Sequence, residues 1–131
     1  MHTTTALTAA VALVALAAVS AQDAHAAGGQ GASLKNPVQA TPVSIEAGQK
    51  IYARYCGACH GPKGQGGPSA EGLPPPSNLT DTRWDHGSTD GAIFTAIKSG
   101  IPPEYAMEPW GDRIKDPDIW NLVNFIRSLR K

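Results

Sequence analysis

Apolar side chains recur every three or four residues in three separate stretches of the chain, the spacing of one face of an α-helix. The first predicts a helix over residues 45–55, with Ser44 as its N-cap. The second predicts a helix that begins after Ser88 and stops at Gly100, and the third a helix over residues 116 to about 130. The apolar positions that define these faces are Ile45, Ile51, Tyr52, Tyr55, Ile93, Phe94, Ile97, Ile119, Leu122, Val123, Ile126 and Leu129.

The stretches between these helices are irregular. Residues 61–79 carry five glycines and five prolines, which is typical of an ordered loop without regular structure, and residues 101–113 also predict a loop. No run alternates polar and apolar residues in the manner of a strand. The pattern therefore predicts an all-α fold, with three principal helices and long loops.

The N-terminal part of the chain reads as a targeting segment. Residues 6–19 form an apolar run broken only by Thr8, which is the length of a signal-peptide core and too short to span a bilayer. Ala24-His25-Ala26 predicts cleavage after Ala26, and Val19-Ser20-Ala21 is an earlier alternative. We expect a signal peptide over 1–26, a flexible leader over 27–43, a folded domain over 44–131 and a periplasmic location. An uncleaved signal would instead anchor the chain in the membrane.

Composition and charge restrict the function. The chain has 131 residues, with 11 Lys and Arg against 11 Asp and Glu, so its formal net charge is zero. This balance gives no reason to expect nucleic acid as a partner, and no strong field for long-range steering. A single small domain has a marginal apolar core, so a large apolar cofactor would stabilise it.

Both cysteines of the chain lie in Cys56-Gly57-Ala58-Cys59-His60. Cys-x-x-Cys-His is the attachment signature of c-type haem: the two thiols add to the vinyl groups of one porphyrin, and the histidine supplies the proximal ligand of the iron. A thioredoxin-like redox pair would be expected near a βαβ pattern, and a structural zinc site normally needs four Cys or His ligands. The motif therefore predicts one covalently attached haem c.

Several segments resemble the class I c-type cytochrome family. Besides Cys56 to Gly61, they are Gly48-Gln49-Lys50-Ile51-Tyr52, Ala106-Met107-Glu108-Pro109-Trp110 and Asn121-Leu122-Val123-Asn124-Phe125-Ile126. The resemblance covers residues 44–130 and implies the small cytochrome c fold, in which the first and last helices cross at Gly48. Residues 84–91 resemble the bacterial branch that serves periplasmic dehydrogenases, oxidases and reductases.

The second axial ligand of the iron has two candidates. Met107 is the one methionine left after signal removal, and it lies in the loop where the resemblance places a thioether ligand. His86 would give a bis-histidine site, although a histidine just before a helix cap is more often solvated. We predict His60 and Met107 as the axial pair.

The resemblance also implies the pocket around the haem. A proline carbonyl would accept a hydrogen bond from the ring nitrogen of His60 that does not bind iron, with Pro76 the best placed of Pro74, Pro75 and Pro76. Trp84, Tyr105 and Trp110, together with Arg83, could hydrogen-bond the haem propionates or pack the rim of the pocket.

The predicted function is one-electron transfer by an exported carrier, monomeric or a subunit, between a redox donor and acceptor such as a dehydrogenase, an oxidase or a reductase. It is not expected to be an enzyme, because no acid/base or nucleophile–base pair is suggested. The alternatives are a dedicated haem subunit of a dehydrogenase or reductase complex, and a haem enzyme or gas sensor with a labile sixth ligand.

Overall fold

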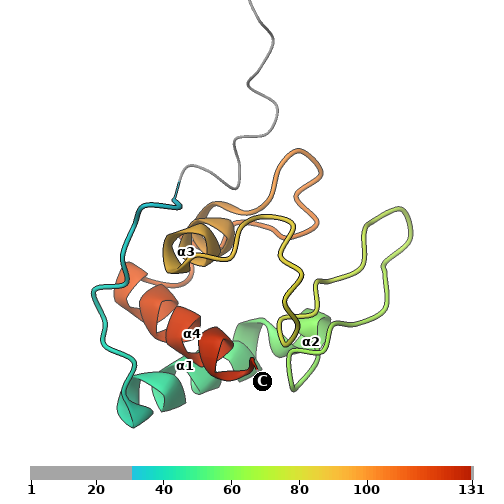
Figure 1. Ribbon diagram of the computed structural model, residues 1–131. Coiled ribbons are helices and arrows are strands. Elements are labelled where there is room, and N and C mark those ends of the chain that lie inside the picture. Colours follow the sequence, from blue (N-terminus) through green and yellow to red (C-terminus); the bar gives the residue numbers. More distant parts are fainter. Residues whose placement is uncertain (1–30, 131) are drawn as a thin grey trace, which may run out of the picture.

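The computed structural model describes residues 31–130, so the predicted signal peptide lies outside the described residues. Four helices follow one another: α1 (Pro42–Tyr55), α2 (Gly57–His60), α3 (Asp90–Ser99) and α4 (Asp116–Ser128), and residues 31–130 contain no strand (Figure 1). The predicted all-α fold is confirmed. The loop before α3 runs between this helix and α2, whereas the loop after α3 extends away from α2 at the top of the view (Figure 1).

The start of α1 differs from the prediction. Thr41, not Ser44, is the N-cap: its hydroxyl accepts the amide hydrogen of Ser44 at 3.2 Å, while the Ser44 hydroxyl accepts that of Thr41 at 3.1 Å. This reciprocal pair is a capping box, and Pro42 in the first turn favours the same start. The predicted leader over 27–43 therefore overlaps the helix.

The other helix ends differ by one or two residues. Thr89 replaces Ser88 as the N-cap of α3, because its hydroxyl accepts the amide hydrogen of Ala92 at 3.2 Å. Lys115 is the N-cap of α4 and makes no side-chain capping bond, so the acids in the first turn of α4 favour its start through the helix dipole. The helix ends at Ser128 and not at Arg130.

The crossing of α1 and α4 forms the centre of the core. A Cβ atom on Gly48 would collide with the carbonyl oxygen of Asn121 and lie 2.8 Å from the Cβ of Phe125, so only glycine allows the helices to approach so closely. The rings of Tyr52 and Phe125 pack with their centroids 5.1 Å apart. This is the crossing that the resemblance implies.

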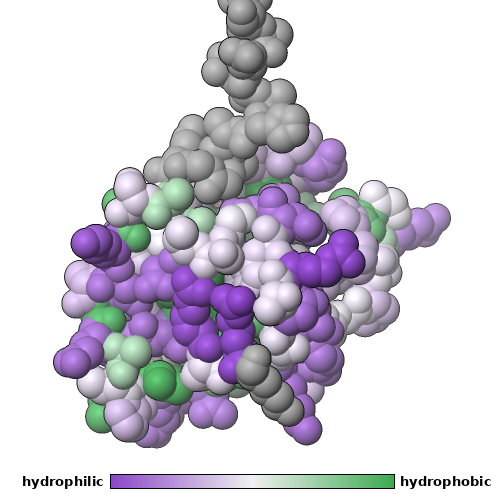
Figure 2. Space-filling view, viewed as in Figure 1, coloured by the Kyte–Doolittle hydropathy of each residue, from purple (hydrophilic) through white to green (hydrophobic). Residues whose placement is uncertain are grey.

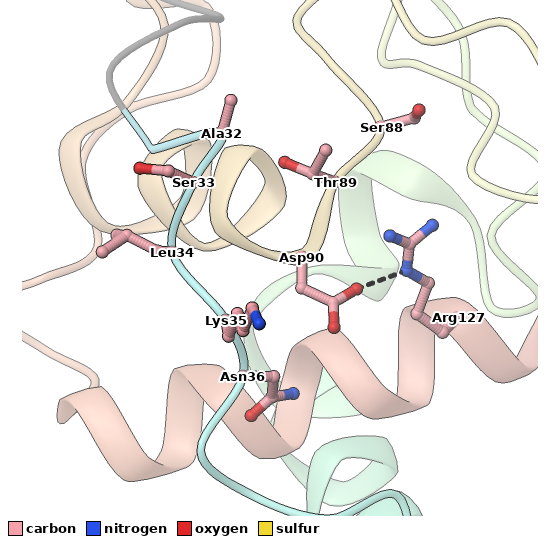
Figure 3. Close-up of a pocket in the computed structure, with 9 residues that line it drawn as sticks. All are labelled: Ala32, Ser33, Leu34, Lys35, Asn36, Ser88, Thr89, Asp90 and Arg127. Carbon is pink, nitrogen blue, oxygen red and sulfur yellow. Dashed lines mark hydrogen bonds and ion pairs between the residues drawn. The ribbon is translucent and has the colours of Figure 1, made fainter.

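The third helix packs on α4 through one aromatic stack and two ion pairs, one of which joins Lys98 to Asp116 at 2.8 Å. The rings of Phe94 and Trp120 lie 4.0 Å apart at 15°, and the Arg127 guanidinium contacts the Asp90 carboxylate at 2.7 Å (Figure 3). That ion pair borders a polar hollow between residues 32–36 and the start of α3. None of its lining residues belongs to the predicted haem site.

A buried asparagine ties the segment before α1 to α4. Asn124 accepts a hydrogen bond from the Asn36 amide at 2.8 Å and donates to the Val38 carbonyl at 3.0 Å and the Ser44 hydroxyl at 3.1 Å. Buried polar groups are tolerated when their hydrogen bonds are made, and this set fixes the path of residues 36–44 across α4.

The surface shown in Figure 2 is largely polar, with small, scattered apolar areas.

Candidate haem site

One helical turn carries the two thiols and the imidazole of the motif. Cys56 joins α1 to α2, and its carbonyl oxygen accepts the amide hydrogens of Cys59 at 3.2 Å and His60 at 2.9 Å. The Cys56 side chain is 9% exposed, whereas that of Cys59 is exposed, and both thiols are free. The turn therefore places one attachment atom against the core and the other at the surface.

The environment of Cys56 differs from that of a redox-active thiol. Burial raises the pKa of this thiol to about 11, and the neighbouring Cys59 adds to the shift. Reactive thiols of thioredoxin-like pairs have lowered pKa values, because the thiolate is the nucleophile.

Among residues 31–130 no group of three or more His, Cys, Asp or Glu side chains is arranged to hold a metal ion.

The His60 ring is held through one of its two nitrogens. Its Nδ1 lies 3.0 Å from the carbonyl oxygen of Ser77, which can only accept, so Nδ1 carries the proton and Nε2 keeps its lone pair for a metal. A proline carbonyl was expected here. The acceptor instead belongs to the residue after Pro76, because the hydrogen bonds of the intervening loop, such as Leu79 N–H to the Gly64 carbonyl at 2.7 Å, set its register.

Tyr52 holds the chain just after the motif, a role that the sequence did not reveal. Its side chain is 2% exposed, and its hydroxyl donates to the carbonyl oxygen of buried Gly61 at 2.6 Å. The bond links the last turn of α1 to the residue that follows His60. A tyrosine on the apolar face of a helix predicts core packing, and only the folded chain shows what its hydroxyl contacts.

Replacing Tyr52 with phenylalanine is expected to lower the free energy of unfolding by about 1–3 kcal/mol, because the Gly61 carbonyl would stay buried without a donor. Thermal unfolding of the holoprotein measures the loss. The matched control is Tyr105→Phe, since that side chain is 49% exposed. Equal losses in the two variants would contradict the role of the buried bond.

The same hydroxyl makes stability depend on pH. Burial raises the pKa of Tyr52 from 10.0 to about 12, and the nearby Cys56 thiol adds a smaller effect. Below pH 10 the hydroxyl is neutral in both states; between about pH 10 and pH 12 only the unfolded chain releases the proton, which favours unfolding. The unfolding midpoint of the wild type should fall more steeply over this window than that of Tyr52→Phe.

The predicted distal ligand lies in the loop between α3 and α4. Met107 is half-buried and packs against the apolar core, and its carbonyl oxygen accepts the amide hydrogen of Ile101 at 2.9 Å. His86, its competitor, is exposed. The difference in burial favours the thioether, and the ligand role of Met107 stays a prediction.

The predicted pocket residues have different surroundings. The Trp84 indole donates to the Asp81 carbonyl at 3.1 Å, so its N–H is already engaged. Trp110 packs on Tyr55 with ring centroids 5.5 Å apart, and the Arg113 guanidinium lies 4.3 Å from its ring centroid. Tyr105 is largely exposed and Pro76 is half-buried. Trp110 is thus the aromatic side chain that links the segment before Cys56 to the segment after Met107.

Together these residues fit a covalent haem. Two free thiols share a helical turn with an imidazole whose Nδ1 is already hydrogen-bonded, which is the donor set that c-type haem requires. Partly buried apolar side chains, which include Tyr55, Met107 and Trp110, pack against the core and supply surface for a porphyrin.

Residues 43–126 match the protein family described as cytochrome c oxidase, cbb3-type, subunit III. The chain belongs to this family. It is a c-type cytochrome domain, and the family carries covalently bound haem c, an electron-transfer cofactor. Among residues 31–130 no helix is long and apolar enough to cross a membrane.

Curated relatives of the chain are also subunits of cbb3-type cytochrome c oxidases. The cbb3-type cytochrome c oxidase subunit FixP of Sinorhizobium medicae (strain WSM419) is 32% identical over 88 residues, which is 67% of this chain and 28% of the relative. FixP of Bradyrhizobium sp. (strain ORS 278) is 35% identical over 83 residues, 63% of this chain and 27% of the relative. The cbb3-type cytochrome c oxidase subunit CcoP of Rubrivivax gelatinosus is 32% identical over 89 residues, which is 67% of this chain and 27% of the relative. The chain thus spans less than a third of the length of these relatives.

Proposed function

We propose that this chain is the haem c subunit of a respiratory oxidoreductase complex, and that the complex is a cbb3-type oxidase. The chain would relay single electrons to this complex on the periplasmic side. Cys56 and Cys59 would hold the haem, with His60 and Met107 as axial ligands. The similarity to oxidase subunits supports a dedicated subunit over a freely diffusing carrier.

The observation that carries the proposal is the hydrogen bond from His60 Nδ1 to the Ser77 carbonyl at 3.0 Å. It orients the imidazole and fixes the tautomer in which Nε2 is free to bind iron. When bound, the haem iron supplies reversible one-electron chemistry. The chain's own part is to hold the ring of His60, to keep water from the core side of the site, and to fill the second axial position with Met107.

This arrangement favours electron transfer over catalysis. An iron with both axial positions filled has no vacancy for oxygen or a substrate, and a thioether ligand favours the ferrous state and raises the reduction potential. One-electron transfer needs no general acid or base.

A free mono-haem carrier of class I is the second candidate function. In the part of the chain that the structure describes, no buried side-chain nitrogen or oxygen lacks a hydrogen-bond partner, so the domain does not need a partner surface to satisfy its own polar groups. Such a carrier would dock transiently through a small interface, as weak redox encounters do.

Native purification distinguishes the two. Membranes and periplasm of the source cells are separated, and haem-stained fractions are resolved by size after mild detergent extraction. We expect the chain to elute with an oxidoreductase, and the complex to accept electrons from a reduced mediator only when the chain is present. Elution as a monomer from the periplasmic fraction would contradict the subunit role and favour the free carrier.

A further inference from the structure

The loop that carries Met107 is attached to the C-terminal end of α3. Trp110 donates its amide hydrogen to the Ile97 carbonyl at 3.0 Å, and Gly111 donates to the Lys98 carbonyl at 3.0 Å. The last four carbonyls of a helix have no partner within the helix, so these loop amides satisfy two of them. The position of the loop therefore depends on how closely its backbone approaches α3.

Gly100 lies where that approach is closest. It ends α3 with φ +72, and a Cβ atom there would lie 2.8 Å from the Met107 carbonyl oxygen, 2.8 Å from the Pro109 nitrogen and 3.0 Å from the Glu108 carbonyl carbon. All three are backbone atoms, which cannot turn aside as the end of a flexible side chain can. The next residue, Ile101, donates to the same Met107 carbonyl at 2.9 Å.

We propose that Gly100 is a positioning residue for Met107. Its lack of a side chain lets the backbone of Met107 pack against the end of α3, and this contact sets the point from which the thioether reaches the iron. The inference rests on the proposed ligand role of Met107. It gives Gly100 a function beyond ending the helix, which glycines at this position commonly do because they tolerate a positive φ.

A second glycine separates the two roles. Gly72 has φ +75, close to the φ +72 of Gly100, but a Cβ atom there would meet nothing within 4 Å. Alanine at either position would have to adopt a positive φ, which side chains disfavour, and only alanine at position 100 collides with the ligand loop. Gly72→Ala is therefore the matched control for Gly100→Ala.

The test compares holoprotein of the wild type, Gly100→Ala and Gly72→Ala. The readouts are the weak long-wavelength band that sulfur-to-iron charge transfer gives in the ferric form, carbon monoxide binding by the ferrous form, and the reduction potential. We expect Gly100→Ala to lose the band, to bind carbon monoxide and to have a lower potential. Gly72→Ala should match the wild type in all three, even if both variants unfold at lower temperature.

Each other result decides against the inference. A Gly100→Ala protein with the wild-type band and potential would overturn it, even if that protein is less stable, because the glycine would then serve the helix end alone. Loss of the band in Gly72→Ala as well would overturn it, since backbone strain would explain both. Absence of the band from the wild type would instead remove the ligand role of Met107 on which the inference rests.

A milder variant decides the question if Gly100→Ala accumulates no holoprotein. A Cβ atom on Gly111 would lie 3.0 Å from both the carbonyl oxygen and the Cγ of Lys98, a contact that a shift of a few tenths of an ångström relieves. Gly111→Ala should therefore move the loop less and weaken the charge-transfer band without abolishing it. An unchanged band in Gly111→Ala would then count against the inference.

Discussion

Replacing both Cys56 and Cys59 with alanine should leave a chain without attached haem and without a stable fold. A small domain is stabilised by only about 5–15 kcal/mol, and this one would lose both a large apolar group and the covalent link that holds it. Each single substitution should keep one thioether bond. The measurements are haem staining after denaturing electrophoresis, acid–acetone extraction and far-ultraviolet circular dichroism.

The control for the double substitution is Ala58→Ser, which changes the same helical turn and keeps both thiols. It should retain haem through denaturation and extraction. If acid–acetone removes haem from the wild-type protein, covalent attachment is wrong. If the double variant folds without haem, the cofactor is not what stabilises the core.

The three longer helices could be predicted from the sequence because each has a strong local signal, whereas the four-residue α2 could not. The apolar stripe of residues 119–129 and the Asp-Pro-Asp start identify α4, and Gly100 identifies the end of α3. The start of α1 was misplaced for an equally local reason. In a capping box two hydroxyls bond reciprocally, so Ser44 at the third helical position resembles the cap itself, and Thr41-Pro42 was the better signal.

The contacts that position the site depend on tertiary structure and could not be predicted. The motif predicted His60 as an axial ligand, but whether Pro76 or Ser77 offers its carbonyl to the ring depends on the loop's register, which residues near Gly64 and Leu79 fix. The hydroxyl of Tyr52 and the amide of Asn124 lie on apolar helix faces, where periodicity predicts burial and says nothing of hydrogen-bond partners.

Membership of the oxidase subunit family changes the weight of the functional alternatives. The sequence favoured a free carrier, with a subunit role left open by the resemblance of residues 84–91 to a branch that serves dehydrogenases, oxidases and reductases. The relatives are several times longer than the stretch they share with this chain. A haem domain of the same design therefore occurs within larger subunits, and electron relay inside a complex becomes the stronger proposal.

The distal ligand gives the second large expected effect. Replacing Met107 with alanine should open the sixth coordination position of the iron, so that the ferrous form binds carbon monoxide and the reduction potential falls with the loss of the thioether. The half-buried position of Met107 against the core, beside the end of α3, is the physical reason to expect this. Absorption spectroscopy with and without carbon monoxide, and a redox titration, measure it.

Replacing His86 with alanine is the matched control, because its side chain is exposed and it is the alternative ligand. This variant should keep the long-wavelength charge-transfer band and the reduction potential of the wild type. Its ferrous form should not bind carbon monoxide. If His86→Ala opens the iron and Met107→Ala does not, the site has two histidine ligands. The protein would then be a carrier of lower potential, because imidazole donation does not favour ferrous iron as a thioether does.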